Sequence, residues 1–386
     1  MTFRPDPRWL LALLLAAGCG GSGTIGDDDA ADDDDSAIGD DDDSVADDDD
    51  SAATGCAPEV TLAVGMVRTS GAVLTGEVDG DGVAAFLGVP FAEPPVGALR
   101  LRAPVAYACR DESLDASEFG PACPQPDADG ALFGDEDCLS LNVFTPGLPP
   151  PGEEVDEPVP VLFFIHGGGN VQGSASVGDG YALYDGSELA RRFGVVVVTV
   201  QYRLGALGFL ALELLADEGV GSGNFGLMDQ TLALQWTQEN IGSFGGDPER
   251  VLLFGESAGA VDVCSLLVAP DARGLFAAAI MQSGACNAFR AEQAQDRGAT
   301  LVEELGCADA GDPLDCLRGL GASAFAALSR NSSGAGGLVG NTGFGPTVDG
   351  AFLPLAPGPA IDAGEAADVP IILGTNRDET AIWIPP

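Results

Sequence analysis

Continuous apolar runs alternate with helix-like segments along the second half of the chain. The apolar runs lie at residues 159–165, 194–200, 250–254 and 369–374. Helices are predicted between and beside them, at residues 187–193, 229–240, 258–267 and 291–305. Strands without polar alternation are typical of a sheet that helices cover on both faces. The pattern therefore predicts an α/β fold with a mostly parallel central sheet.

Ahead of these runs, residues 60–74 and 82–102 mix short apolar stretches with turn residues. This pattern predicts antiparallel strands that precede the parallel part of the sheet. We expect the folded domain to span residues 57–386.

The first residues have the pattern of a secretory signal. Two arginines precede an apolar run from Trp9 to Ala17, far shorter than the roughly 20 residues that span a bilayer. The small residues that end at Cys19 resemble a bacterial lipobox, which predicts a signal peptide over 1–18 and lipidation of Cys19. An ordinary signal peptide with an incidental cysteine is the alternative. We expect export across the inner membrane, with a lipid anchor as the only membrane contact, at the outer membrane, the cell surface or the periplasm.

Residues 19–56 are predicted to be a disordered, Asp-rich tether. Fifteen aspartates and no basic residue occupy positions 27–50, so this segment repels itself and has little apolar surface to bury. Calcium binding is the alternative, but the runs of four aspartates lack the alternating spacing of a calcium loop. A structural surface lipoprotein is a further interpretation, which depends on this tether alone.

The composition excludes several functions. The formal net charge is −44 and all 16 basic residues are arginines, so we expect no nucleic-acid partner, because phosphate binding needs many basic side chains. His166 is the only histidine, which excludes sites built from several imidazoles. No metal or cofactor is expected, and the sequence carries no signal for the oligomeric state.

A serine lies where a predicted strand meets a predicted helix. The motif G-E-S-A-G occupies residues 255–259, directly after the apolar run 250–254. This is the context of a nucleophile elbow, in which the flanking glycines let the backbone pass through a tight turn. We expect the Ser257 hydroxyl to project above the sheet.

A glycine run follows another predicted strand. The motif H-G-G-G at residues 166–169 comes directly after the apolar run 159–165. Backbone N–H groups in such a run can stabilise the oxyanion of a tetrahedral intermediate. A flexible glycine loop is the alternative, but the nearby elbow favours an acyl-transfer site.

An ordered series of motifs resembles the type-B carboxylesterases, relatives of the cholinesterases within the α/β-hydrolase superfamily. The motifs are G-V-P-F-A at 88–92, E-D-C-L-S-L-N-V at 136–143, H-G-G-G at 166–169, Q-Y-R-L-G at 201–205, G-N-F-G-L-M-D-Q at 223–230 and N-I-G-S-F-G-G-D-P at 240–248. The resemblance runs from about residue 60 to the end of the chain. It implies an α/β-hydrolase fold and the hydrolysis of a small-molecule carboxylic ester through an acyl-serine.

The resemblance also implies roles for individual residues. The matching positions are Ser257 as nucleophile, Glu256 as its acidic neighbour, and Gly168, Gly169 and Ala258 as oxyanion donors. The triad acid corresponds to Glu379, whose carboxylate would orient a histidine. The residues alone leave the adjacent Asp378 open for that role, and a solvated acidic turn is the alternative.

The general base has no candidate at the expected place. In this fold the triad histidine follows the acid along the chain, but no histidine follows Glu379 here. His166 precedes the nucleophile and matches a structural histidine of the family. We therefore expect a C-terminally truncated family member whose 386 residues are nearly inactive alone. A non-catalytic adhesion module on the same scaffold is the alternative.

Without Cys19 eight cysteines remain, an even number that suits disulfides in an exported protein. The resemblance implies the pairs Cys123–Cys138 and Cys307–Cys316. The sequence does not indicate how Cys56, Cys109, Cys264 and Cys286 pair, and buried free thiols are the alternative for the last two.

The resemblance says little about the substrate beyond its class. The loop between Cys123 and Cys138 contains no tryptophan that could hold a quaternary ammonium group by cation–π attraction. A choline ester is therefore not expected.

Overall fold

The computed structural model describes residues 62–110, 112–127, 129–150, 155–176, 184–216, 221–329 and 343–379. The predicted signal peptide, Cys19, the Asp-rich tether and Cys56 lie outside the described residues. No helix within the described ranges is long and apolar enough to cross a membrane.

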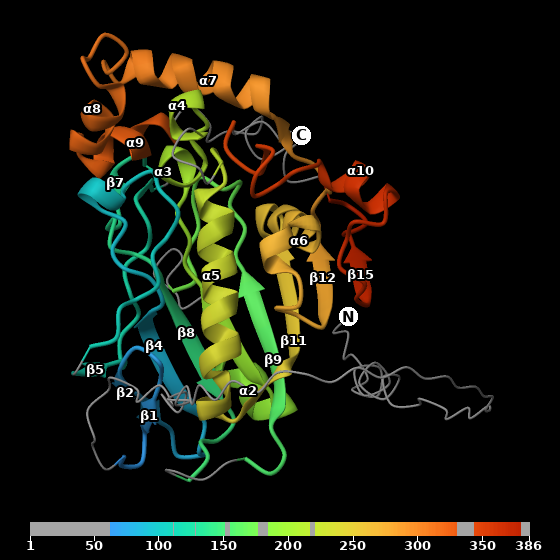
Figure 1. Cartoon of the computed structure of the whole chain (residues 1–386). Helices are drawn as coiled ribbons and strands as arrows, with labels where there is room; N and C mark the ends of the chain where they lie inside the picture. The colour runs from blue at the N-terminus through green and yellow to red at the C-terminus, as the bar shows by residue number, and fades with distance from the viewer. Residues whose placement is uncertain are drawn as a thin grey trace, which may run out of the picture. The chain divides into compact units, whose positions relative to one another are not determined.

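Among the described residues, eight strands form the central sheet in the order β15-β12-β11-β9-β10-β8-β4-β3 (Figure 1). The parallel strands are β9 (Val159–Ile165), β10 (Val196–Val200), β11 (Gly246–Glu256), β12 (Ala278–Gln282) and β15 (Ile371–Gly374). The antiparallel strands are β3 (Glu77–Val78), β4 (Ala84–Pro90) and β8 (Ser140–Thr145). The prediction of a mostly parallel sheet that follows antiparallel strands is confirmed.

Four helices occupy the predicted segments, within a few residues at each end. They are α2 (Ser187–Phe193), α5 (Phe225–Asn240), α6 (Ala258–Val268) and α7 (Ala291–Glu304). Five further helices were not predicted: α3 (Gly205–Phe209), α4 (Glu213–Leu215), α8 (Pro313–Gly319), α9 (Ala322–Leu328) and α10 (Pro357–Asp362). Figure 1 shows α7, α8 and α9 together at the top of the view, beyond the upper end of α5, whereas α10 lies to the side, where it packs against α6.

The other strands of the described residues are short and lie outside the central sheet. β1 (Met66–Arg68), β2 (Val73–Thr75) and β5 (Ser113–Asp115) form a small separate sheet. Two further pairs join β6 (Gln125–Pro126) to β7 (Leu132–Phe133) and β13 (Phe289–Arg290) to β14 (Thr347–Val348).

Helices pack on both faces of the sheet. On one face Ala190 of α2 packs with Phe144 and Val197. The larger core contains Val143 and Val198, which are the next residues along the same two strands. Because successive strand residues point to opposite faces, these two clusters lie on opposite sides of the sheet. The apolar runs of the sequence are explained by this double cover.

One strand departs from that expectation. Ile371, Ile372 and Leu373 of β15 are 43%, 42% and 67% exposed, although their pattern predicts a strand covered on both faces. Among the described residues β15 pairs only with β12, so it forms an edge of the sheet. Its apolar side chains therefore lack the neighbours that the central strands have.

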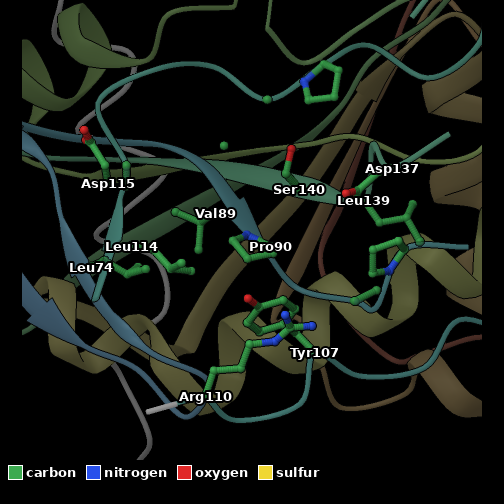
Figure 2. A pocket seen from close by; sticks show the side chains of 16 residues that line it. Leu74, Val89, Pro90, Tyr107, Arg110, Leu114, Asp115, Asp137, Leu139 and Ser140 are labelled. Atoms are coloured by element: carbon green, nitrogen blue, oxygen red, sulfur yellow. The ribbon is translucent and has the colours of Figure 1, made fainter. Parts of the chain in front are cut away.

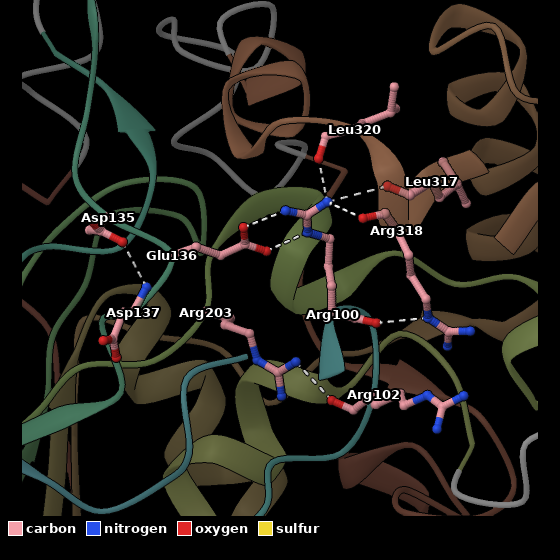
Figure 3. Close-up of polar contacts among 9 residues, drawn as sticks. All are labelled: Arg100, Arg102, Asp135, Glu136, Asp137, Arg203, Leu317, Arg318 and Leu320. Atoms are coloured by element: carbon pink, nitrogen blue, oxygen red, sulfur yellow. Dashed lines mark hydrogen bonds and ion pairs between the residues drawn. The ribbon is translucent and has the colours of Figure 1, made fainter. Parts of the chain in front are cut away.

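A buried arginine joins the N-terminal part of the domain to α8 and the segment after it (Figure 3). The Arg100 guanidinium donates to both carboxylate oxygens of Glu136, over 2.5 and 2.6 Å. It also donates to the carbonyl oxygens of Arg318 at 2.7 Å and of Leu320. Because Glu136 precedes Cys138 by two residues, this contact also fixes the loop that the Cys123–Cys138 disulfide closes.

Candidate active site

Ser257 lies at a strained turn between β11 and α6. Its backbone has φ 55° and ψ −119°, a conformation that residues with a Cβ rarely adopt. A Cβ on Gly255 would lie 2.5 Å from the Gly259 carbonyl carbon, and one on Gly259 would lie 2.2 Å from the Ile165 carbonyl oxygen. Both glycines of the G-E-S-A-G motif are therefore required by close backbone contacts. The geometry is that of the predicted elbow.

The glycine run lies directly against this elbow. A Cβ on Gly167 would lie 3.1 Å from Ser257 Cβ and 2.8 Å from Glu256 Oε2. The residues that follow, Gly168, Gly169 and Asn170, all have positive φ, at 114°, 66° and 59°. Three such residues in succession reverse the chain at the end of β9.

The predicted oxyanion donors are free of internal partners within the described part of the chain. Neither Gly168 nor Gly169 donates its backbone N–H to a described residue. Ala258 is the first residue of α6, where backbone N–H groups have no partner within the helix. This arrangement suits the binding of an oxyanion next to Ser257.

Glu379 lies five residues after the end of β15. Its Oε2 accepts from the Asn376 backbone N–H at 2.5 Å. A hydrogen bond from the Ser283 side chain, followed by that backbone bond, lowers the pKa of Glu379. Its charge also acts on Glu256, whose pKa is raised first by burial and then by repulsion from Glu379. The charge of Glu379 therefore acts on the carboxylate of the residue that precedes Ser257.

The adjacent Asp378 has a different environment. Its carboxylate accepts from the Arg377 guanidinium at 2.9 Å, and its side chain is 67% exposed. Of the two candidate acids, Glu379 is the one held by hydrogen bonds from the ends of β12 and β15 and coupled to Glu256.

His166 is buried behind the glycine run. It is 1% exposed, and its ring stacks on Tyr202 with centroids 4.5 Å apart. Its Nδ1 lies 2.8 Å from the Gly167 carbonyl oxygen. Burial lowers the pKa of His166 to about 4, so the imidazole is neutral and shielded from solvent.

The sequence reasoning missed a buried polar cluster behind the same loop. Asp262 of α6 accepts from Asn170 at 3.0 Å and from Gln230 of α5 at 2.7 Å. A charged residue inside the apolar segment 258–268 was the available signal, since such residues are seldom fully buried without a partner.

Three disulfides are present among the described residues. Cys123–Cys138 and Cys307–Cys316 form the pairs that the family resemblance implies. The third joins Cys264 to Cys286, so the alternative of two buried free thiols is wrong. These two residues come together because α6 packs against β12, whose end lies four residues before Cys286. Cys109 is also disulfide-bonded.

A cavity of about 320 Å³ lies near the N-terminal strands (Figure 2). Apolar side chains such as Leu74, Val89 and Leu114 line it, together with Tyr107 and Arg110. None of the predicted site residues contributes to its wall. Within the described part of the chain, no group of His, Cys, Asp and Glu side chains could hold a metal ion.

Comparison with known proteins agrees with this geometry. The Carboxylesterase family profile matches residues 57–385. The para-nitrobenzyl esterase of Bacillus subtilis is 39% identical over 321 residues, which cover 81% of this chain and 63% of that protein. The acetylcholinesterase of Electrophorus electricus is 37% identical over 355 residues, which cover 85% of this chain and 52% of that enzyme.

A solved structure of a PNB esterase superposes with a TM-score of 0.73 at 38% identity, covering 83% of this chain and 65% of that one. The chain thus spans between about half and two thirds of the length of these relatives. The order of strands, the elbow and the extent of the match lead to one conclusion: this chain belongs to the carboxylesterase family.

Proposed function

We propose that the site at Ser257 hydrolyses carboxylic esters through an acyl-serine. Ser257 Oγ attacks the ester carbonyl carbon, and the carbonyl oxygen becomes an oxyanion. The alcohol leaves with the proton that a general base has taken from Ser257. Water then cleaves the acyl-serine and restores the serine hydroxyl. The observation that supports this proposal is the close approach of Gly167 to Ser257, since a Cβ added to Gly167 would lie 3.1 Å from Ser257 Cβ.

Gly168, Gly169 and Ala258 are the proposed oxyanion donors. Their backbone N–H groups are positioned before substrate arrives, so they need little reorganisation when negative charge develops. Glu379 is the proposed acid that orients the base. Its lowered pKa keeps it ionised at neutral pH, as stabilisation of an imidazolium requires.

In our proposal, none of these 386 residues acts as the general base. The only histidine is buried, stacked on Tyr202 and positioned behind the glycine run, so its imidazole has no route to the Ser257 hydroxyl. A triad enzyme without its base loses on the order of 10⁶ in kcat. We therefore expect these residues alone to turn over esters barely faster than the background.

Added imidazole provides the test. The purified chain and the Ser257→Ala variant are incubated with a chromogenic acetate ester, with and without free imidazole, and the variant's rate is subtracted. We expect almost no Ser257-dependent turnover alone and a clear increment when imidazole replaces the missing base. Ser257-dependent turnover without imidazole would contradict the proposed lack of a base. Absence of any increment would contradict the assignment of Ser257 as nucleophile.

We also propose that the substrate is not a choline ester, because the loop between Cys123 and Cys138 contains no tryptophan. We further propose that the protein is exported and lipid-anchored through Cys19. Metabolic labelling with a radioactive fatty acid should mark the wild-type chain and leave a Cys19→Ser variant unlabelled.

A further inference from the structure

A buried carboxylate holds the loop that carries the proposed oxyanion donors. Asp262 lies five residues after Ser257 on α6 and is 0% exposed. Its Oδ1 accepts from Asn170 Nδ2 at 3.0 Å, and its Oδ2 accepts from Gln230 Nε2 at 2.7 Å. No arginine of the described ranges forms an ion pair with it, so its hydrogen-bond donors among the described residues are two side-chain amides.

Asn170 connects this carboxylate to the glycine run. It directly follows Gly169, and its carbonyl oxygen accepts from the Gly205 backbone N–H at 2.7 Å. Its side-chain oxygen accepts from the Tyr202 hydroxyl at 3.2 Å, and the same hydroxyl lies 2.9 Å from the His166 carbonyl oxygen. Residues 166–170 are therefore tied at both ends to the same buried cluster.

The chemistry of the cluster explains why an acid stands at this position. Asn170 and Gln230 both present N–H donors to Asp262, so the residue between them must accept at both of its oxygen atoms. Among side chains this short, only a carboxylate offers two separate oxygen atoms that both accept. A buried carboxylate without a cation is unfavourable, and its hydrogen bonds are correspondingly strong.

We propose that Asp262 is a positioning residue for the oxyanion loop: its carboxylate holds Asn170, and so fixes the backbone N–H groups of Gly168 and Gly169 beside Ser257. The effect of this contact on catalysis rests on the proposed function. The hydrogen bond between Asp262 and Asn170 is a feature of the structure and does not depend on that function.

The ionisation of Asp262 gives the proposal a distinctive signature. Burial raises the pKa of Asp262 to about 7, and only the amides of Gln230 and Asn170 lower it. Above that pH the carboxylate accepts two charge-assisted bonds. Below it one oxygen carries a proton, and the hydrogen bonds from Asn170 and Gln230 both lose their charge assistance.

The surroundings of Asp262 contain few other groups that titrate. On the loop side these are His166 and Tyr202, and on the α5 side Asp229, which is paired with Arg203. β9 and β12 carry no titratable side chain. The remaining titratable groups on elements that pack against α6 are surface groups or partly exposed: Asp247, Glu249, Arg250 and Glu256 of β11, Glu239 of α5, Asp271 and Asp362.

Amide hydrogen exchange of residues 166–173 tests the proposal without any need for turnover. The wild-type chain is compared with Asp262→Asn, which is isosteric but cannot ionise, and with Ser265→Ala, a buried control on the same helix. At about pH 9 we expect the loop of Asp262→Asn to exchange about tenfold faster than wild type, and at about pH 5 less than threefold faster, because Asp262 is then protonated. Ser265→Ala should leave the loop unchanged at both pH values.

A second background separates positioning from general stability. In an Asn170→Ala chain, the further change Asp262→Asn should add almost nothing to loop exchange, because the connection is already broken. Equal loop exchange in wild type and Asp262→Asn at both pH values, or an undiminished effect in the Asn170→Ala background, would overturn the proposal. If Asp262→Asn fails to fold, Asn170→Ala alone must accelerate loop exchange, and unchanged exchange would overturn it equally.

Boron NMR of bound phenylboronic acid links the loop to the nucleophile. A tetrahedral adduct at Ser257 should weaken in Asp262→Asn by about the same factor as loop exchange rises at about pH 9. If wild type forms no adduct, the proposed function fails, while the exchange data still decide the role of Asp262. Adduct affinity that is unchanged while loop exchange rises would overturn the proposed placement of the N–H groups.

Discussion

The strained backbone at Ser257 predicts an unusual order of stabilities for substitutions at that residue. With φ 55° and ψ −119°, Ser257 occupies a region that glycine enters freely and that residues with a Cβ enter at a cost. The Ser257 hydroxyl forms no hydrogen bond with another described residue, so its removal alone changes the free energy of unfolding little. Ser257→Ala keeps the strain, whereas Ser257→Gly removes it.

The expected difference follows from two opposing contributions. A residue with a Cβ held in such a conformation costs about 1–3 kcal/mol. Glycine, in turn, loses roughly 0.5–1 kcal/mol more conformational entropy on folding than alanine. We therefore expect Ser257→Gly to unfold with a free energy about 1 kcal/mol higher than that of Ser257→Ala, the reverse of the usual order.

Urea unfolding followed by tryptophan fluorescence measures this difference. Trp236 of α5 is 6% exposed and reports the loss of the core. A matched pair at Ala299, an exposed position inside α7, provides the control: Ala299→Gly should lower the free energy of unfolding by about 1 kcal/mol. If Ser257→Gly proves no more stable than Ser257→Ala while the control behaves normally, the reasoning about stored strain is refuted.

Two further predictions use the other buried groups. The single histidine gives one set of imidazole NMR signals. Because the pKa of His166 is lowered to about 4, these signals should not titrate between about pH 8 and about pH 5. A titration midpoint near the ordinary histidine pKa in the folded chain would contradict the burial argument. The Arg203 guanidinium donates to both oxygens of buried Asp229, at 2.7 and 2.8 Å. Arg203→Met should lower the free energy of unfolding by about 3–5 kcal/mol, because the carboxylate then loses its only cation among the described residues. Arg191→Met, which breaks exposed pairs with Asp79 and Glu188, should cost less than about 1 kcal/mol in the same denaturation assay, and equal losses would speak against the burial argument.

Features that depend on neighbouring residues in the sequence were predictable, and features that depend on distant contacts were not. The elbow at 255–259 and the glycine run could be identified because strand, turn and helix follow one another within a few residues. β8 was missed because Ser140, Asn142 and Thr145 interrupt its apolar pattern. Asn142 shows the reason for this polarity: its side chain accepts from the Gly88 backbone N–H and donates to Thr199, on the strands to either side of β8.

The candidate site divides in the same way. Ser257 and the glycine run stand out in the sequence, whereas the Asn170–Asp262–Gln230 cluster joins residues that lie up to 92 positions apart. No local sequence pattern relates Asn170 of the glycine loop to Gln230 on α5 and Asp262 on α6. Likewise, the pairing of Cys264 with Cys286 depends on how α6 packs against β12, which periodicity does not determine.

The two buried titratable groups behind the glycine run act on stability in opposite directions. The pKa of His166 is lowered to about 4 in the folded chain, so its contribution to stability is present above its unfolded value of 6.5 and is lost as the pH falls toward 4. The pKa of Asp262 is raised from 3.8 to about 7, so its contribution is present below 3.8 and is lost as the pH rises through 7. Between about pH 4 and about pH 6.5 one gain offsets the other loss.

Above about pH 7 neither group changes the stability further, because His166 is neutral and Asp262 is ionised in the folded and the unfolded chain alike. That is the range in which the carboxylate accepts its strongest hydrogen bonds from Asn170 and Gln230. A neutral, apolar residue at position 262 would give a more stable α6 but would leave the Asn170 amide without an acceptor. The destabilising charge and the ordered glycine run are thus two consequences of the same buried acid.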